Sequence, residues 1–122
     1  MNVKKQILVI DDDVDLNFSL TEFLRDVGYL VESVTDPTKV ENVINTGGYD
    51  VILLDLKMPN ISGTEFIKLI KEKMPASKLI VMSGRPFIKE FLARLGLDSY
   101  VDGILDKPFG VDGLLEKIET TV

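Results

Sequence analysis

The chain alternates short runs of apolar residues with segments in which apolar residues recur at helical spacing. The apolar runs are Ile7–Ile10, Tyr29–Val34, Val51–Leu54, Leu79–Met82 and Gly103–Leu105. Four of these runs show no strict alternation with polar residues, which is typical of strands buried on both faces of a parallel sheet. The pattern therefore predicts five short strands connected by helices.

Helical spacing is clear in the segment after the first run, where leucine, phenylalanine and valine recur and Gly28 follows as a helix stop. After the third run, Ser62 stands three residues before Glu65, and Pro75 lies just past the apolar positions. This is the pattern of a capping box with a clean helix end. The predicted helices are Asp15–Val27, Lys39–Asn45, Ser62–Met74, Phe87–Leu95 and Val111–Thr120.

The predicted elements alternate strictly between strand and helix along the whole chain. Such alternation favours a doubly wound α/β fold with one central parallel sheet and five helices. The 122 residues amount to one domain, and no repeat, low-complexity segment or linker divides them. We therefore expect one domain over residues 1–122, without an effector domain in this sequence.

Polar residues follow four of the predicted strands. In a doubly wound fold, ligands bind just outside the carboxyl ends of the strands, and these four ends meet around one crevice. The sequence therefore predicts several carboxylates, one hydroxyl and one ammonium group in a small volume. These residues are Asp11, Asp12 and Asp13 after the first strand, Asp55 after the third, Ser83 after the fourth and Lys107 after the fifth.

Clustered carboxylates repel one another, and a hard divalent cation with oxygen ligands, commonly Mg²⁺, offsets that repulsion. A pocket of this kind also suits phosphoryl transfer, which needs positioning and charge neutralisation, and an aspartate can itself be the nucleophile. Taken singly, an aspartate after a strand is as often a helix cap or turn former. We interpret Asp13 and Asp15 as such caps, whereas Asp12 and Asp55 together with Ser83 and Lys107 favour the functional interpretation.

Composition narrows the chemistry further. The chain has no Cys and no His, which excludes disulfides, thiolate and imidazole metal sites, histidine general bases and phosphohistidine carriers. With 14 basic and 20 acidic residues the net charge is −6, and no basic cluster predicts direct nucleic-acid binding. No apolar run approaches membrane-spanning length and no secretory signal is present, so we expect a cytoplasmic protein without membrane contact.

At this point four stretches of the chain, read together, resemble the receiver domains of response regulators in two-component signalling. They are ILVIDDD, DVILLDLKMPNISGTEFI, LIVMSG and GILDKPF, which stand in this order and span essentially the whole chain. The resemblance implies a flavodoxin-like five-stranded sheet with strand order 2-1-3-4-5. It also implies a phosphoacceptor signalling domain that assists only its own phosphorylation and dephosphorylation, and is not an enzyme in the usual sense.

The resemblance assigns a role to each matching position. Asp55 is the expected phosphoacceptor, Ser83 the hydrogen-bond donor to the phosphoryl group, and Lys107 the partner of a phosphoryl oxygen or of Asp55. Mg²⁺, for which Mn²⁺ could substitute, is expected to bind Asp55, Asp12, Asp11 (through water) and the backbone carbonyl of Lys57. The Lys107–Pro108 bond is expected to be cis, and Pro59 and Gly63 are expected to shape the loop after Asp55.

The resemblance also implies partners. The expected phosphodonor is a histidine kinase or a phosphotransfer protein, and the expected recipient of the signal is a downstream protein target or a missing effector domain. Receivers of this family usually dimerise through the face formed by the fourth and fifth helices, so a homodimer through that face is a further expectation.

Two features depart from the family pattern. The position three residues before Lys107, often aromatic in the family, is Ile104, which has no ring to rotate as a switch. The stretch from Ser83 to Lys107 is slightly longer than usual, with the extra residues in Leu97–Asp102. This loop either reshapes a contact surface or is a harmless surface insertion.

Two basic residues, Lys57 and Arg85, flank the predicted site. Either they hold the phosphoryl oxygens or both are solvated side chains. Two other functions also stay open: a receiver-like interaction module that works without phosphorylation, and a phosphatase with an aspartate nucleophile. The second is disfavoured because such phosphatases commonly carry another aspartate where this chain has Lys57.

Overall fold

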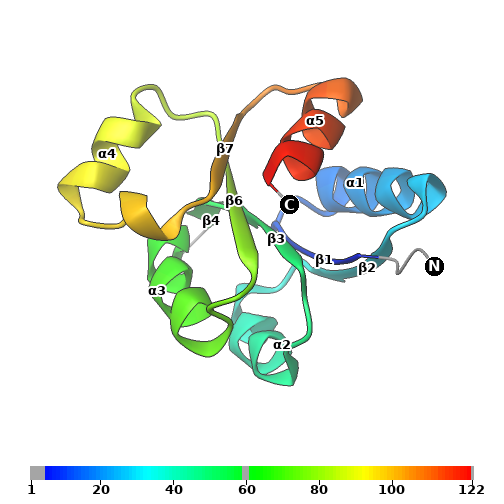
Figure 1. Cartoon of the computed structure of the whole chain (residues 1–122), viewed down its shortest axis with the longest axis horizontal. Coiled ribbons are helices and arrows are strands. Elements are labelled where there is room, and N and C mark those ends of the chain that lie inside the picture. The colour runs from blue at the N-terminus through cyan, green and yellow to red at the C-terminus, as the bar shows by residue number, and fades with distance from the viewer. Residues whose placement is uncertain (1–4, 59–60, 122) are drawn as a thin grey trace.

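The structure is a computed structural model of the chain that describes residues 5–58 and 61–121, with the backbone alone at 58, 61 and 62. Its centre is a parallel sheet in the order β2-β1-β3-β6-β7, which is 2-1-3-4-5 in chain order, as predicted (Figure 1). The sheet contains β1 (Gln6–Ile10), β2 (Leu30–Val34), β3 (Val51–Asp55), β6 (Lys78–Ser83) and β7 (Gly103–Asp106).

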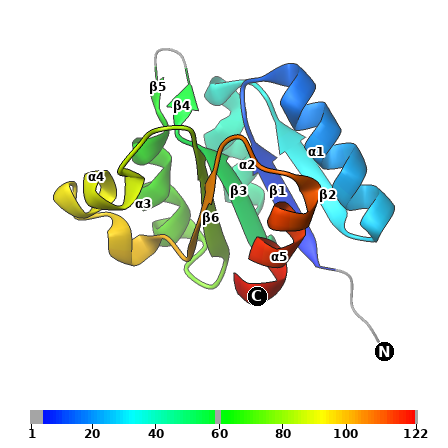
Figure 2. The same ribbon diagram turned by 90° about the horizontal axis from the view of Figure 1, so that it is seen from above.

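The sequence did not predict a small antiparallel hairpin between the third strand and the third helix. Its strands, β4 (Lys57–Met58) and β5 (Ile61–Ser62), have two residues each and pair with one another. Figure 2 shows the hairpin beyond the edge at which the strands of the main sheet end. The two short strands therefore lie between Asp55 and the start of α3 at Gly63.

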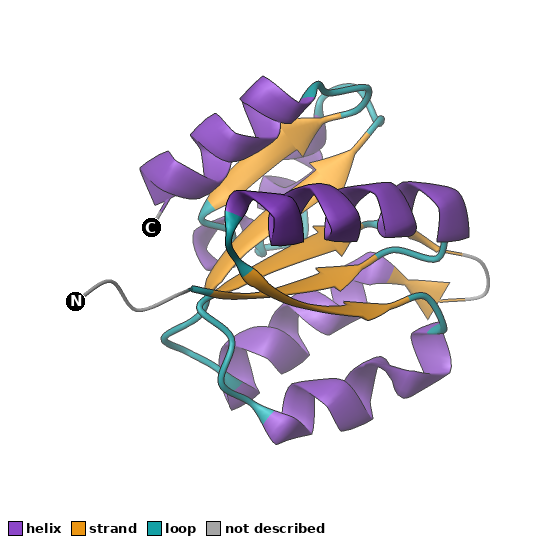
Figure 3. Cartoon of the chain, turned by 90° about the vertical axis from the view of Figure 1, so that its right-hand side faces the viewer, coloured by secondary structure: helices purple, strands orange, loops and turns teal. Residues whose placement is uncertain are grey.

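Four α-helices connect the strands of the main sheet and a fifth follows its last strand, and together these predicted helices cover the sheet on both sides (Figure 3). α1 and α5 pack on one face, and α2, α3 and α4 on the other. None of the helices in the described ranges has the length and apolar character of a membrane span. The helices are α1 (Val14–Val27), α2 (Val40–Thr46), α3 (Gly63–Lys73), α4 (Ile88–Arg94) and α5 (Val111–Thr121), with single 3-10 turns at η1 (Pro37–Lys39) and η2 (Asp98–Tyr100).

The ends of α1 follow from its sequence. The side chain of Asp13 accepts a hydrogen bond from the Leu16 backbone N–H at 3.1 Å, which confirms Asp13, and not Asp15, as the N-cap. Gly28 ends the helix with a φ of 119°, a conformation that favours glycine. The side chain of Ser62 lies outside the described residues, so its capping box stays a prediction, and α3 begins one residue later than expected.

The core consists of two apolar layers separated by the sheet. Every residue of β3 is buried, and β1 and β6 are buried except at their first residues. Burial on both faces explains why these strands appear in the sequence as unbroken apolar runs. The sheet is thus a rigid platform, and its carboxyl edge carries the polar residues of interest.

The extra loop before β7 is tied to the sheet by Asp102. Its Oδ2 atom accepts hydrogen bonds from the Leu79 backbone N–H at 2.8 Å and from Lys71 Nζ on α3 at 3.0 Å. Burial alone would raise the pKa of Asp102, but these donors outweigh burial and hold its pKa below the ordinary value of 3.8. The loop is therefore anchored at its end, and its role in partner contact stays a prediction.

We predict that Asp102→Asn lowers the free energy of unfolding at pH 7 by about 1–2 kcal/mol, because charged hydrogen bonds are lost. The folded-state pKa is below the unfolded value, so this contribution is present above pH 3.8 and disappears as the pH falls through the folded-state pKa. Urea unfolding of both proteins between pH 7 and pH 3 measures the difference, which should shrink at the acid end. Asp98→Asn is the control, since Asp98 is exposed and forms no ion pair within the described residues; an equal loss there would contradict the prediction.

Candidate functional site

The candidate site lies where the strands of the main sheet end. Asp11 directly follows β1, Asp55 is the last residue of β3, Ser83 is the last residue of β6, and Lys107 directly follows β7. The parallel register pairs Asp55 with Met82, one residue before Ser83. The four strand ends therefore gather at one edge, the edge to which the arrowheads point in Figure 3.

Three carboxylates meet at this edge. Asp11, Asp12 and Asp55 each place one carboxylate oxygen within 4.8 Å of the other two. Asp11 and Asp55 are buried, at 0% and 4% exposure, while Asp12 is half-buried. Three hard oxygen donors in this arrangement fit a divalent cation such as Mg²⁺ or Ca²⁺, so the residues predicted as side-chain ligands do come together.

Lys107 neutralises part of this charge. Its Nζ atom lies 3.3 Å from Asp11 Oδ2 and 3.3 Å from Asp55 Oδ1. Burial alone would lower the pKa of Lys107, but the two carboxylates outweigh it and raise the pKa above 10.5. The lysine therefore stays protonated, and from the end of the edge strand it bridges the residues at the ends of β1 and β3.

The negative charge of Asp11 remains unfavourable despite this lysine. Burial and the charge of Asp55 raise the pKa of Asp11 above its ordinary value of 3.8, against the lowering effects of the Asp13 backbone N–H and of Lys107. The Asp13 N–H donates to Asp11 Oδ1 at 3.0 Å. The charged form of Asp11 is thus incompletely compensated by the protein alone, which is what a cation site requires.

Asn17 supports the site and was missed in the sequence. Its side-chain amide is buried and donates to the backbone carbonyls of Asp11 at 3.0 Å and Val34 at 3.1 Å. Thr21 donates in turn to Asn17 Oδ1 at 3.2 Å. The signal was available, because Asn17 and Thr21 are polar residues one turn apart that continue the buried stripe of α1.

Ser83 is buried and linked on both sides. Its Oγ atom accepts a hydrogen bond from the Arg85 backbone N–H at 3.0 Å, and its carbonyl accepts from the Lys107 backbone N–H at 2.8 Å. The Arg85 guanidinium carbon lies 3.7 Å from the centroid of the Phe91 ring. Arg85 and Lys57 are both exposed, and neither forms an ion pair with the carboxylates within the described residues, but Arg85 stacks on a ring.

The loop after Asp55 depends on a close backbone approach at Gly63. A Cβ atom at this position would lie 2.6 Å from Leu56 Cα and 2.7 Å from the Asp55 carbonyl oxygen. The Asp55 side chain also accepts from the Lys57 backbone N–H at 3.3 Å. Gly63 thus shapes the loop as expected, while Pro59 lies outside the described residues and the metal role of the Lys57 carbonyl stays a prediction.

The peptide bond between Lys107 and Pro108 is cis, as the resemblance implied. Ile104, at the position that is often aromatic in the family, is partly buried and packs against the apolar layer that includes α4. The Ile104 side chain therefore contributes to packing on that face.

Comparison with known proteins gives consistent results. The family model described as the response regulator receiver domain matches residues 7–119. Response regulator protein PmrA of Pseudomonas aeruginosa is 31% identical over 113 residues, which are 93% of this chain and 50% of PmrA. Transcriptional regulatory protein BasR of Escherichia coli is 30% identical with the same coverage. The chain spans about half the length of these curated relatives.

Solved structures agree with the fold. A response regulator from Burkholderia pseudomallei, crystallised with a phosphorylated aspartic acid, a calcium ion and citrate, has a TM-score of 0.84 at 26% identity, covering 96% of this chain and 68% of that one. Response regulator protein TrrA from Thermotoga maritima, in complex with Mg²⁺-BeF, has a TM-score of 0.83 at 29% identity, covering 97% and 99%.

We predict that Gly63→Ala lowers the free energy of unfolding by about 1–3 kcal/mol, because the added methyl group meets backbone atoms that cannot rotate away. Gly113→Ala is the matched control, since nothing lies within 4 Å of a Cβ there. Gly113 is in α5, so alanine should stabilise the protein by about 0.5–1 kcal/mol. Urea unfolding of both variants decides, and similar effects at the two positions would contradict the prediction.

We also predict that Asp11→Asn stabilises the metal-free protein at pH 7. Because the folded-state pKa of Asp11 is raised, its protonated form stabilises the folded wild type, and this stabilisation is fully present below pH 3.8. It is lost as the pH rises through the folded-state pKa. The advantage of the variant should therefore grow over the same interval. Thermal unfolding in EDTA from pH 3 to 8 measures it, and a variant that is less stable at pH 7 would contradict the prediction. Added Mg²⁺ should stabilise wild type more than the variant.

Proposed function

The chain belongs to the response regulator receiver domain family, and from this premise we propose that it accepts a phosphoryl group on Asp55. The carrying observation is the position of the Asp55 carboxylate, which is buried, lies 3.3 Å from Lys107 Nζ and shares one cluster with Asp11 and Asp12. A carboxylate that lies next to a protonated lysine and within a candidate metal site is suited to act as a nucleophile toward phosphorus.

The proposed step forms one bond and breaks one. A carboxylate oxygen of Asp55 attacks the phosphorus atom of the donor and forms a new P–O bond. The bond from phosphorus to the donor, P–N for a phosphohistidine or P–O for acetyl phosphate, breaks and leaves its electron pair on the donor. The product is an aspartyl phosphate, and later attack by water returns the carboxylate and inorganic phosphate.

Each side chain has a distinct part in this step. Lys107, now between Asp11 and Asp55, is placed to pair with a phosphoryl oxygen once that oxygen occupies the site. Ser83, buried at the end of the neighbouring strand, is the proposed donor of a hydrogen bond to another phosphoryl oxygen. Burial of Asp55 limits access of water to the modified carboxylate.

Asp11, Asp12, Asp55 and the backbone carbonyl of Lys57 are the proposed ligands of Mg²⁺, with Mn²⁺ as a substitute. The clustered carboxylate oxygens and the raised pKa of Asp11 support a divalent cation at this position. The structures of relatives with Mg²⁺-BeF and with Ca²⁺ are consistent with it. Bound there, the cation would supply positive charge for the phosphoryl oxygens.

The proposed donor is a histidine kinase or a phosphotransfer protein. The 122 residues contain no histidine, so a phosphohistidine donor must lie outside them. The proposed unit of function is one receiver domain over residues 1–122, which passes the signal to an effector domain or a separate protein target. It acts on no substrate but its own Asp55, and a homodimer through α4 and α5 stays a prediction.

We predict that acetyl phosphate with Mg²⁺ adds a single phosphoryl group to the protein and none to Asp55→Asn, as measured by intact mass. Replacing Mg²⁺ by EDTA should lower the rate of labelling by about two orders of magnitude, because the charge of the phosphoryl oxygens is no longer offset. Asp106→Asn is the control, since Asp106 is exposed and lies at the same edge outside the carboxylate cluster.

The alternative functions give other outcomes in the same experiment. No adduct on wild type, with Mg²⁺ still bound, would favour an interaction module that works without phosphorylation. Steady turnover of an unrelated phosphate ester would favour a phosphatase. Equal labelling of wild type and Asp55→Asn would place the phosphoryl group elsewhere and contradict the assignment of Asp55.

A further inference from the structure

Arg85 connects the candidate site with α4. Its backbone N–H donates to Ser83 Oγ at 3.0 Å, so the backbone of Arg85 is fixed next to the end of β6. Its guanidinium lies over the ring of Phe91, with 3.7 Å between Cζ and the ring centroid. Arg85 forms no ion pair among residues 5–58 and 61–121. The cation–π contact is thus the interaction that holds the side chain in place.

The start of α4 lacks a side-chain cap. The helix has seven residues and starts after Phe87, which has a φ of 58° and provides no side-chain cap. Short helices are marginal without tertiary support, and a left-handed phenylalanine is a strained start. Phe87 is also 78% exposed. Ile88 and Leu92 hold the helix to the core, so the weak point is the uncapped backbone at its start.

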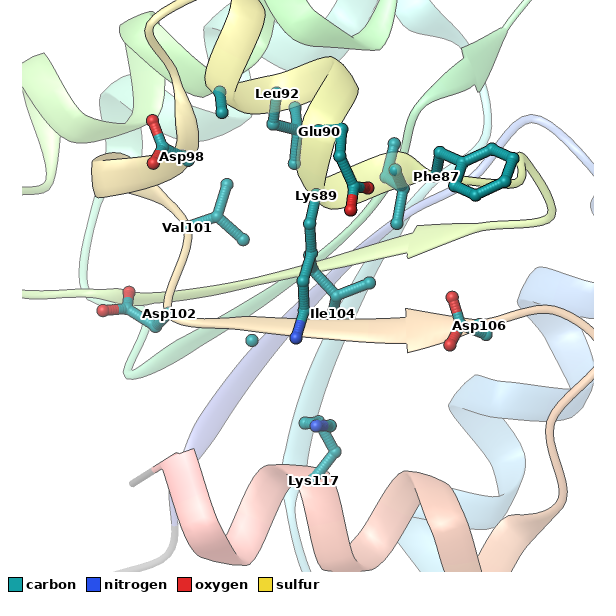
Figure 4. A pocket seen from close by; sticks show the side chains of 13 residues that line it. Phe87, Lys89, Glu90, Leu92, Asp98, Val101, Asp102, Ile104, Asp106 and Lys117 are labelled. Atoms are coloured by element: carbon teal, nitrogen blue, oxygen red, sulfur yellow. The ribbon is translucent and has the colours of Figure 1, made fainter.

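There is also room beside this helix. A cavity of about 870 Å³ lies between α4, the edge strand β7 and α5. Figure 4 shows Lys89 and Leu92 of α4 on one side of it, Ile104 on β7, and Lys117 on α5 on the other side. The cavity leaves space on this side of α4, while Ile88 and Leu92, which line it, are buried in the apolar core.

The charge of the site changes when Asp55 is modified. A phosphoryl group brings additional negative charge and several strong acceptor oxygens. A guanidinium binds such oxygens through charge-assisted hydrogen bonds, which are stronger than an exposed cation–π contact. Arg85 follows Ser83 by two residues, and Ser83 lies at the end of the strand that pairs with the strand of Asp55. The new anion is therefore a nearby competitor of Phe91 for the guanidinium.

We propose that Arg85 relays the state of Asp55 to α4: its guanidinium rests on Phe91 in the unmodified protein and moves to the phosphoryl group after modification, which loosens the helix. The inference rests on the proposed function of Asp55. It requires no aromatic residue at Ile104, because the ring that responds is Phe91 on α4 itself. The weak start of α4 and the cavity beside it are what allow the lost contact to change the helix.

Hydrogen exchange of the α4 amides, read by mass spectrometry before and after treatment with acetyl phosphate and Mg²⁺, tests the relay. In wild type, we expect phosphorylation to speed exchange in Ile88–Arg94 about two- to fivefold, the factor that corresponds to an exposed cation–π contact. In Arg85→Gln, exchange should be faster by the same factor before treatment and should not rise further. Phe91→Leu, which keeps an apolar side chain but removes the ring, should behave in the same way.

Arg94→Gln is the matched control, because Arg94 lies on the same helix and makes no ring contact or ion pair in the described part of the chain. It should respond to phosphorylation as wild type does. Intact mass of the same samples gives the fraction modified, and exchange is compared at equal fractions. A full response in phosphorylated Arg85→Gln, or modified wild type without any change in α4, would overturn the relay alone. Absence of an adduct on wild type would overturn the proposed function as well.

Discussion

The ion pairs of Lys107 with Asp11 and Asp55 hold the functional edge of this protein together. Two carboxylates that are almost fully buried stand at the ends of β1 and β3, and their mutual repulsion opposes folding. The lysine reaches them from the edge strand of the sheet, 3.3 Å from each. This arrangement limits the cost of burying the carboxylates, but the raised pKa of Asp11 shows that one lysine does not fully offset the two negative charges.

Much of this architecture can be predicted from the sequence, for a physical reason. Strands covered on both faces must be apolar throughout, so β1, β3 and β6 stand out as unbroken runs between amphipathic segments. In a parallel sheet all strands end at one edge, so a polar residue after each run has a predictable place. That is why the sequence alone places Asp11, Asp12, Asp55, Ser83 and Lys107 at one edge of the sheet.

Other features depend on contacts between residues distant in the chain or on side-chain conformation, which spacing does not encode. The two-residue strands β4 and β5 are too short to have a period. The spacing of Asn17 indicates burial, but its hydrogen bonds to the carbonyls of Asp11 and Val34 become evident only when the strand ends are placed beside it. Asp102 gains its role from donors on α3 and β6 that lie at least 23 residues away in the chain. The stacking of Arg85 on Phe91 depends on the path of a long, exposed side chain.

α1 and α4, which lie on opposite faces of the sheet, are attached to the site in different ways. α1 is fixed to it by the Asp13 cap and by the buried amide of Asn17, which binds the strand ends directly. α4 begins at a strained residue without a side-chain cap. Under the proposed relay, phosphorylation would change α4 and leave the attachment of α1 intact. A protein that recognises α4 would then discriminate between the two states, whereas a protein that recognises α1 would not.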